Sequence, residues 1–329
     1  MKIGLYDGSN FNISFDETST YLGGSETWML EIGKAFSKLG HEVFMFENPK
    51  NFHTFENIHF IPKNKFKEVA DIIEFDKFIF SRGIENYEYV KSKDISLIVH
   101  DIFLEKNNYL DKLKSLSNVY VLSDWHKNIF QQRYGKLDNI KITFNGVDLS
   151  LFEKQEKTNT MIWSSVLERG LNYFIKYVYP KIKKEIPDFK LKFCSYNKYN
   201  FNNTDIEYLG QLSKKELAKE QCKAKIWCYP NLGFADNNPN FKETFCITAV
   251  ENAAAGNCII TTSLGGLGTT CNGMNFITNE FYINEKIKDL ESYGNHLAKL
   301  CIKALKGEYF NTFNYSKFTW ENAALNLLQ

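Results

Sequence analysis

The stretch from Asn240 to Gly256 reads NFKETFCITAVENAAAG and places two glutamates, Glu243 and Glu251, eight positions apart. Small and apolar residues fill most of the rest, which predicts a helix that begins near Phe245. Eight helical residues rise about 12 Å, the length of a nucleotide-sugar from hexose to ribose. The free N–H groups at such a helix start favour an anion such as a diphosphate. Taken alone, the pair also fits a half-buried helix with one first-turn glutamate and one solvated glutamate.

On both sides of this stretch, short apolar runs alternate with helical patterns, which favours an α/β fold with largely parallel sheets. A turn at Asn145–Asp148, followed by a polar run from Glu153 to Thr160, marks the expected domain boundary. We expect strands at Lys2–Tyr6, Glu42–Phe46, Lys77–Phe80, Ser96–His100, Val119–Leu122, Ile140–Thr143, Thr160–Ser164, Lys190–Phe193, Ile206–Leu209, Lys225–Tyr229 and Cys258–Thr261. We expect helices at Ser25–Leu39, Lys65–Ile72, Asn107–Leu116, Asp124–Tyr134, Arg169–Glu185, Lys214–Cys222, Thr248–Ala255, Glu285–Ala304 and Trp320–Leu328.

The composition excludes several classes of protein. Forty basic and thirty-nine acidic residues give a net charge of +1, so we expect no nucleic-acid partner, which would need a basic excess. The longest uncharged stretch, Asn252 to Asn279, is broken by glycines and polar residues, so no transmembrane segment is expected. The first residues read as a strand rather than a signal peptide, and the seven cysteines form no Cys-x-x-Cys pair. Reduced thiols in a cytoplasmic protein are the expectation.

Arginine is rare in this chain: only Arg82, Arg133 and Arg169 stand among the forty basic residues. Where lysine is the default cation, each arginine is a candidate for a role that needs a planar fork. Arg133 ends a predicted helix, where it complements the helix dipole. Several other sites are excluded, because the chain has no G-x-G-x-x-G after a strand, no phosphate loop and no His-Glu-x-x-His.

Three groups of motifs extend the pattern into both halves of the chain. The first is the glutamate pair with Trp227-Cys228-Tyr229-Pro230 before it and Cys258-Ile259-Ile260-Thr261-Thr262 after it. The second is Trp163-Ser164-Ser165-Val166-Leu167-Glu168-Arg169-Gly170-Leu171, and the third is Gly23-Gly24-Ser25-Glu26 with Gly40-His41-Glu42-Val43. Together they resemble retaining GT-B glycosyltransferases, especially glycosyltransferase family 4.

The resemblance implies an α/β GT-B fold, with two Rossmann-like domains whose parallel sheets face each other across a cleft. Residues 1–147 would form the acceptor-side domain and residues 148–310 the nucleotide-sugar donor domain. Residues 311–329 would return to the first domain as a C-terminal helix.

The resemblance also implies roles for single residues. Glu243 would contact the hydroxyls of the transferred sugar, Glu251 the ribose, and Arg169 the diphosphate, which suits its fork. Gly23 and Gly24 would let the backbone approach the donor phosphates, although a plain turn before a helix fits them too. The other donor-binding residues implied are Ser164, Ser165, Thr244, Phe245 and Cys246.

Two residues of the first half are candidates at strand ends. His100 closes a predicted strand, where the family often has a histidine near the reacting centre, while a structural histidine is the ordinary alternative. Arg82 also follows a strand, and a place on the acceptor or phosphate side fits it as well as a structural role does. One departure stands out: many relatives have a basic residue at the position of Ser164. The phosphate charge would then be met by Arg169, hydroxyls and the helix start, with Lys242 nearby.

The resemblance implies transfer of a sugar from a UDP- or GDP-linked donor to a hydroxyl of a glycan, glycolipid or glycoprotein, with retention of anomeric configuration. The nucleotide-sugar is a co-substrate, and no cofactor is expected. No metal is expected either, since no Asp-x-Asp motif is present near the predicted cleft. The alternatives are a GT-B-like sugar-nucleotide epimerase and a non-catalytic protein that binds a nucleotide-sugar.

Overall fold

The computed structural model describes residues 1–8, 15–19, 21–49, 51–104, 109–195, 199, 201, 203–233, 241–271, 280–284, 286–311 and 314–329. Asn107, Asn240, Glu285 and residues 272–279 of the uncharged stretch lie outside the described residues. The chain divides into two compact units, one of residues 1–146 with 318–329 and one of residues 147–317.

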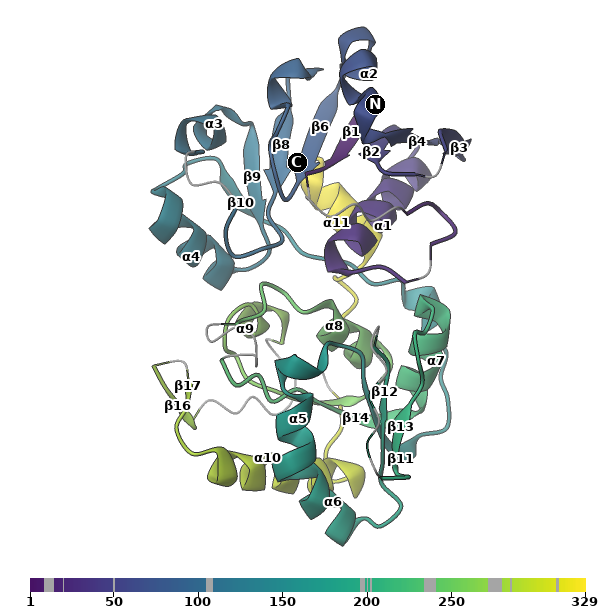
Figure 1. The fold of residues 1–329 in the computed structure, drawn as a ribbon, viewed down its shortest axis with the longest axis vertical. Coiled ribbons are helices and arrows are strands. Elements are labelled where there is room, and N and C mark those ends of the chain that lie inside the picture. The colour runs from purple at the N-terminus through teal and green to yellow at the C-terminus, as the bar shows by residue number, and fades with distance from the viewer. Residues whose placement is uncertain are drawn as a thin grey trace. The chain divides into compact units, whose positions relative to one another are not determined.

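Unit 1 is built on an eight-stranded sheet (Figure 1) in the order β10-β9-β8-β6-β1-β2-β4-β3. All neighbours are parallel except β3, which runs antiparallel to β4 at the edge. The strands are β1 (Lys2–Asp7), β2 (Glu42–Glu47), β3 (His53–Phe55), β4 (Ile58–Pro62), β6 (Lys77–Ser81), β8 (Ile95–Ile98), β9 (Asn118–Val121) and β10 (Ile140–Ile142), with β5 (Glu74–Phe75) and β7 (Lys91–Ser92) forming a separate pair.

Helices cover both faces of this sheet. The helices of unit 1 are α1 (Gly24–Lys38), α2 (Phe66–Ile72), α3 (Leu110–Ser115), α4 (Asp124–Tyr134) and α11 (Trp320–Leu327). An aromatic-rich cluster joins one face to α2, α3 and α4 through Phe66, Leu113 and Phe130. On the other face α1 packs over β1 and β2, where Gly33 approaches Leu5 and Met45.

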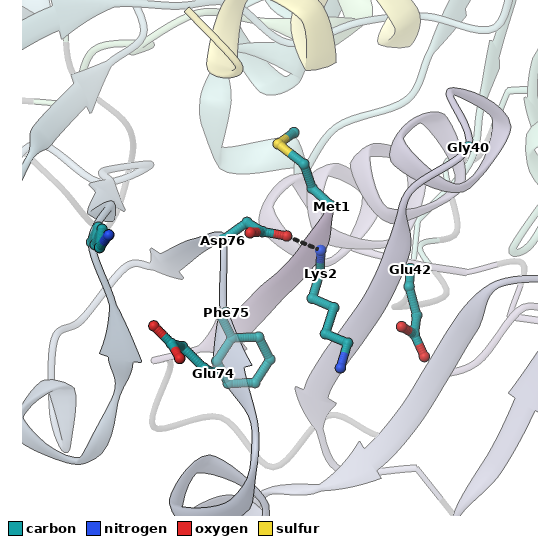
Figure 2. A pocket seen from close by; sticks show the side chains of 8 residues that line it. Met1, Lys2, Gly40, Glu42, Glu74, Phe75 and Asp76 are labelled. Carbon is teal, nitrogen blue, oxygen red and sulfur yellow. Dashed lines mark hydrogen bonds between the residues drawn. The ribbon is translucent and has the colours of Figure 1, made fainter.

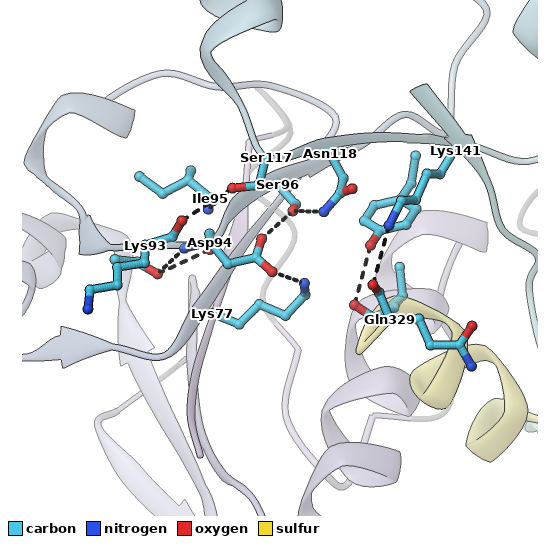
Figure 3. Close-up of polar contacts among 12 residues, drawn as sticks. Lys77, Lys93, Asp94, Ile95, Ser96, Ser117, Asn118, Lys141 and Gln329 are labelled. Atoms are coloured by element: carbon cyan, nitrogen blue, oxygen red, sulfur yellow. Dashed lines mark hydrogen bonds and ion pairs between the residues drawn. The ribbon is translucent and has the colours of Figure 1, made fainter. Parts of the chain in front are cut away.

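The C-terminal helix α11 belongs to unit 1 and lies beside α1 (Figure 1). Its end is held by two contacts with the sheet: the Tyr120 hydroxyl donates to the carbonyl of Leu327 at 3.3 Å, and Lys141 donates to that of Gln329 at 3.4 Å. Figure 3 shows the second contact beside a partly buried network in which Lys77 pairs with Asp94.

A pocket of about 660 Å³ opens at the amino edge of the unit 1 sheet (Figure 2). Its lining comes from residues that begin or precede strands: Met1, Lys2, Gly40, Glu42, Glu74, Phe75, Asp76 and Lys93. Ligands of open α/β sheets bind at the opposite, carboxyl edge. None of the residues predicted for the functional site lines this pocket.

Unit 2 has a five-stranded parallel sheet in the order β13-β12-β11-β14-β15. Its strands are β11 (Thr158–Trp163), β12 (Lys190–Phe193), β13 (Ile206–Tyr208), β14 (Ala224–Cys228) and β15 (Cys258–Ile260), and β16 (Tyr282–Ile283) pairs separately with β17 (Lys286–Ile287). Its helices are α5 (Leu171–Tyr173), which continues through a π-helical segment, Phe174–Val178, into α6 (Tyr179–Glu185), then α7 (Lys214–Lys223), α8 (Ile247–Ala254), α9 (Leu267–Thr270) and α10 (Leu290–Leu305).

Several sequence-based expectations need correction. The helix expected at Arg169–Glu185 begins at Leu171, after a 3₁₀ turn at Leu167–Arg169. Strands β3 and β4 were not predicted; β4 is a short apolar run that ends at a proline, yet it pairs fully with β2. Helix α10 begins five residues later than expected, because Asp289 caps it by accepting from two backbone N–H groups. Strand β8 ends at Ile98, so His100 lies two residues beyond the strand that it was expected to close.

Candidate functional site

Glu243 lies on the segment between β14 and α8, with its side chain 14% exposed. Its Oε1 atom accepts a hydrogen bond from the Tyr229 hydroxyl at 2.8 Å and faces Nη1 of Arg169 at 3.4 Å. Tyr229 directly follows β14, and Arg169 belongs to a short 3₁₀ turn, η4 (Leu167–Arg169), that follows β11. The three side chains therefore meet at the carboxyl edge of the unit 2 sheet, where α/β proteins bind ligands.

The guanidinium of Arg169 also lies over the ring of Phe241, 4.5 Å from its centroid. A carboxylate and an aromatic face thus both fix a planar cation, a combination that arginine meets better than lysine. The side chain of Arg169 remains 38% exposed. This leaves part of the fork open to an anion.

The segment with Glu243 leads into helix α8 through an unusual residue. Cys246 has φ 80° and ψ 78°, a left-handed conformation that is costly for a residue other than glycine. Helix α8 therefore begins at Ile247 rather than near Phe245, and Glu243 stands outside the helix. The expectation that eight helical residues, and so a rise of about 12 Å, separate the two glutamates is therefore wrong. Burial, followed by the nearby charge of Glu243, raises the pKa of the Cys246 thiol well above its usual value, which keeps the thiol neutral.

Two glycines support the backbone beneath Glu243. The N–H of Gly266 donates to the carbonyl of Glu243 at 2.6 Å. A Cβ atom at Gly266 would lie 2.1 Å from the carbonyl oxygen of Thr244, and Gly265 has φ +66°. Thr270 adds a hydrogen bond to the carbonyl of Phe245. The close approach of the two backbone segments requires glycine at position 266.

The second predicted donor segment follows β11. The hydroxyl oxygen of Ser164 is buried and has no hydrogen-bond partner in the described part of the chain. Its neighbour Ser165 accepts a hydrogen bond from the Trp163 indole at its carbonyl, at 2.9 Å. Because buried hydroxyls are nearly always hydrogen-bonded in folded proteins, the Ser164 hydroxyl fits a site whose ligand supplies the partner.

Glu251 has different partners from Glu243. Its side chain is 9% exposed, and Lys214 donates to Oε1 at 2.8 Å. Gln221 donates to Oε2 at 3.4 Å. Both partners lie on α7, so the second glutamate is part of an α7–α8 contact.

In unit 1 the structure brings Arg82 to the start of helix α1. Its Nη1 donates to the Ser25 hydroxyl at 3.2 Å and lies 3.9 Å from Glu26, while Nε donates to Asp101 at 2.8 Å. Arg82 has φ 71°, another left-handed residue. The guanidinium thus joins the Gly-Gly-Ser-Glu turn to the loop after β8.

The two glycines of this turn have different surroundings. A Cβ atom at Gly23 would meet the Glu26 carboxylate at 2.5 Å, whereas one at Gly24 would have no atom of the described residues within 4 Å. Packing among the described residues of unit 1 therefore does not explain a glycine at position 24.

Two histidines neighbour Asp101: His100 directly precedes it in the sequence, and His126 contacts it through the imidazole ring. His126 is buried; its Nδ1 accepts from the N–H of Leu122 and its Nε2 donates to the carbonyl of Asp101 at 2.9 Å. Burial lowers the pKa of His126 to about 4. Burial, then the charges of Arg82 and His126, lowers the pKa of His100 to about 3. The His100 ring packs edge-on against Trp28. With its pKa lowered to about 3, the imidazole is neutral at pH 7.

Comparison with known proteins identifies the architecture. No protein-family model matches the sequence, and no curated protein matches it. Among solved structures, AviGT4, a glycosyltransferase involved in avilamycin A biosynthesis, superposes with a TM-score of 0.68 at 11% identity, covering 100% of this chain and 96% of that one. Anabaena HepE, solved in complex with UDP and glucose, gives 0.65 at 12% identity over 100% and 98%. Sucrose-phosphate synthase from Thermosynechococcus elongatus gives 0.65 at 14% identity over 100% and 97%.

The chain has the GT-B fold. The expectation of two α/β units with parallel sheets is thereby confirmed. Within the GT-B units, Arg169, Glu243 and Ser164 follow strands of unit 2, and Arg82 and His100 follow strands of unit 1.

Several residues that contact the candidate site in this GT-B chain have no individual role in the sequence pattern. Tyr229 stands there only within a motif, and Lys214 and Gln221 only within a helix. Their long-range contacts leave no local signal. Gln221 is the exception, because a polar residue on the apolar face of an amphipathic helix suggests a buried partner.

The described residues contain neither a candidate metal site nor a helix suited to a membrane. No group of three His, Cys, Asp or Glu side chains in those ranges could hold a metal ion. None of the helices described combines the length and apolar character needed to cross a membrane.

Proposed function

We propose that this GT-B protein is a retaining glycosyltransferase that moves a sugar from a UDP- or GDP-linked donor to a hydroxyl of a glycan, glycolipid or glycoprotein. The observation that carries the proposal is the cluster of Arg169, Glu243 and Tyr229 at the carboxyl edge of the unit 2 sheet. It joins a cation suited to a diphosphate with a carboxylate suited to sugar hydroxyls.

In the proposed reaction, the bond between the anomeric carbon and the diphosphate oxygen breaks, and its electron pair leaves on the diphosphate. The acceptor oxygen bonds to the same face of the anomeric carbon, and its proton passes to the departing diphosphate. Arg169, the Ser164 hydroxyl and the N–H groups at the start of α8 would stabilise the developing negative charge. Glu243 would hold the sugar ring, and His100 would stay near the reacting centre as a neutral group.

This arrangement supplies a cation, a hydroxyl and backbone dipoles for the leaving group, so we propose that no metal is required. The test of the activity incubates the full chain with UDP- and GDP-linked sugars labelled in the sugar, together with simple glycoside acceptors. Release of nucleoside diphosphate with a labelled product of unchanged anomeric configuration is expected, also after treatment with EDTA.

Other products would contradict the proposal in distinct ways. An epimerised donor would indicate a sugar-nucleotide epimerase, and binding without turnover would indicate a non-catalytic protein. Loss of activity in EDTA that Mn²⁺ restores would overturn metal independence alone.

A further inference from the structure

The carboxylate of Glu251 is held at both of its oxygens by one neighbouring helix. Lys214 donates to Oε1 at 2.8 Å and Gln221 to Oε2 at 3.4 Å. Gln221 is 1% exposed and Glu251 is 7% exposed. A buried carboxylate without partners is very costly, and these two donors hydrogen-bond both oxygens of Glu251 inside the unit.

The sequence places the two donors on one face of α7. Lys214 and Gln221 stand seven residues apart, which is about two helical turns. Ser213 and Glu216 form a capping box that fixes where α7 begins, and therefore which face Lys214 occupies. The next residue, Lys215, is exposed. The contact with α8 is thus specific to position 214.

The start of α7 lies at the carboxyl edge of the sheet. Lys214 is the first residue of α7 and follows the parallel strand β13 by six residues, so the helix begins on the side where that strand ends. The Lys214 ammonium reaches the Glu251 carboxylate from this edge at 2.8 Å. That is the edge on which the Arg169–Glu243 cluster also stands.

An ionised carboxylate offers about four acceptor positions, and Lys214 and Gln221 use one on each oxygen. Within the described part of the chain, one position remains on each oxygen, which matches the two adjacent hydroxyls of a ribose. We propose that Lys214 and Gln221 are positioning residues that hold the Glu251 carboxylate oriented for the ribose diol of the donor. This inference rests on the proposed function, because it takes the ligand of Glu251 to be a ribonucleotide.

The test measures binding of UDP and GDP to the full chain by calorimetry, and then of the 2′-deoxy form of whichever nucleotide binds. Lys214→Met should weaken ribonucleotide binding about tenfold, because one charge-assisted hydrogen bond holds the carboxylate in place. The 2′-deoxy nucleotide should lose less, so the preference for ribose should fall. In turnover, KM for the donor should rise about tenfold while kcat stays within about twofold.

Three variants accompany this measurement. Lys214→Arg keeps a cation and should restore most of the ribose preference. Lys215→Met removes the adjacent charge and should bind like the wild type. If Lys214→Met does not fold, Gln221→Leu tests the second donor, with the same loss of ribose preference expected.

Equal or tighter binding by the folded Lys214→Met protein would overturn the positioning role while leaving nucleotide binding, and so the proposed function, intact. Tighter binding would mean that Lys214 blocks the carboxylate instead of orienting it. A wild-type protein that binds neither nucleotide and turns over neither donor would instead overturn the proposed function, and this inference with it.

Discussion

The Tyr229 hydroxyl donates to the Glu243 carboxylate at 2.8 Å, on the same oxygen that faces Arg169. The buried Tyr229 side chain thus orients the Glu243 carboxylate, a contact that the sequence does not indicate. Burial, then the charge of Glu243, raises the pKa of Tyr229 well above its usual value, so the tyrosine is a hydrogen-bond donor at every pH of interest.

Tyr229→Phe removes this hydrogen bond with little change in packing, since the ring stacks on Trp227 at 5.3 Å. A hydrogen bond to a charged group contributes about 1.5–3 kcal/mol, so kcat/KM should fall by about tenfold or more. Steady-state kinetics of the folded variant check this. Unchanged kinetics would mean that the orientation of Glu243 does not matter for turnover.

Arg169→Lys keeps the charge but removes the planar fork that lies between Glu243 and Phe241. Donor turnover should fall at least tenfold, because lysine cannot bond two phosphate oxygens in parallel. Arg133→Lys is the matched control, since Arg133 lies over the ring of Phe103 near the end of α4 in unit 1 and has no assigned role in the proposed reaction. Similar kinetics for both variants would remove Arg169 from the proposed site.

Alanine variants of Glu243 and Glu251 should have different effects on KM and kcat. Glu251→Ala removes a contact to the ribose, which changes little during the reaction, so KM for the donor should rise about tenfold with kcat nearly unchanged. Glu243→Ala removes a contact to the reacting sugar and should lower kcat and kcat/KM together. The reverse pattern, measured with saturating acceptor, would exchange the two assignments.

Gly24→Ala tests whether a ligand requires the glycine. A Cβ atom there would meet none of the described residues within 4 Å, and alanine favours a helix, so the thermal midpoint should stay equal or rise slightly. If the donor phosphates approach this backbone, KM for the donor should nevertheless increase severalfold. An unaltered KM would mean that the Gly23-Gly24 turn only leads into α1 and does not contact the donor.

Glu47 gives unit 1 a pH-dependent stability. Its side chain is fully buried at the end of β2 and accepts from the N–H of Phe15 at 3.4 Å, and burial raises its pKa to about 8, with Asp7 and Asp16 adding to the effect. Between about pH 4.5 and pH 8 the folded state therefore binds more protons than the unfolded state, so stability falls as the pH rises through this window.

Glu47→Gln does not titrate, so the variant should lack this decline. At pH 9 it should be more stable than the wild type by on the order of 2–4 kcal/mol, with little difference at pH 5. Urea unfolding at both pH values measures this, and Glu88→Gln on the exposed surface is the control. Parallel pH profiles for Glu47→Gln and the wild type would show that Glu47 is ionised in the folded protein.

Elements with strong local signals were predicted closely. Helix α4 has the predicted bounds, because Ser123 caps it by accepting from the N–H of His126. Strand β12 also has its predicted bounds. Strand β4 was missed because its place is determined by β2, a partner that no local pattern reveals.

In the candidate site, too, residues with a local signal were predicted and long-range contacts were not. Glu243 and Arg169 were predicted from their motifs, and the structure brings them together. The left-handed backbone of Cys246 and the close approach of Gly266 could not be predicted, because both depend on how two distant segments pack. The ion pair between Lys214 and Glu251 likewise depends on how α7 packs beside α8.

The return of α11 to unit 1 has a consequence for synthesis on the ribosome. Unit 2 is one continuous run of the chain, whereas the buried residues Trp320, Ala323 and Leu327 of unit 1 are translated after all of unit 2. The surface of residues 1–146 that α11 covers therefore stays exposed while some 170 further residues are synthesised, at about 5–20 residues per second. The first part of the chain to be made is the last to be completed.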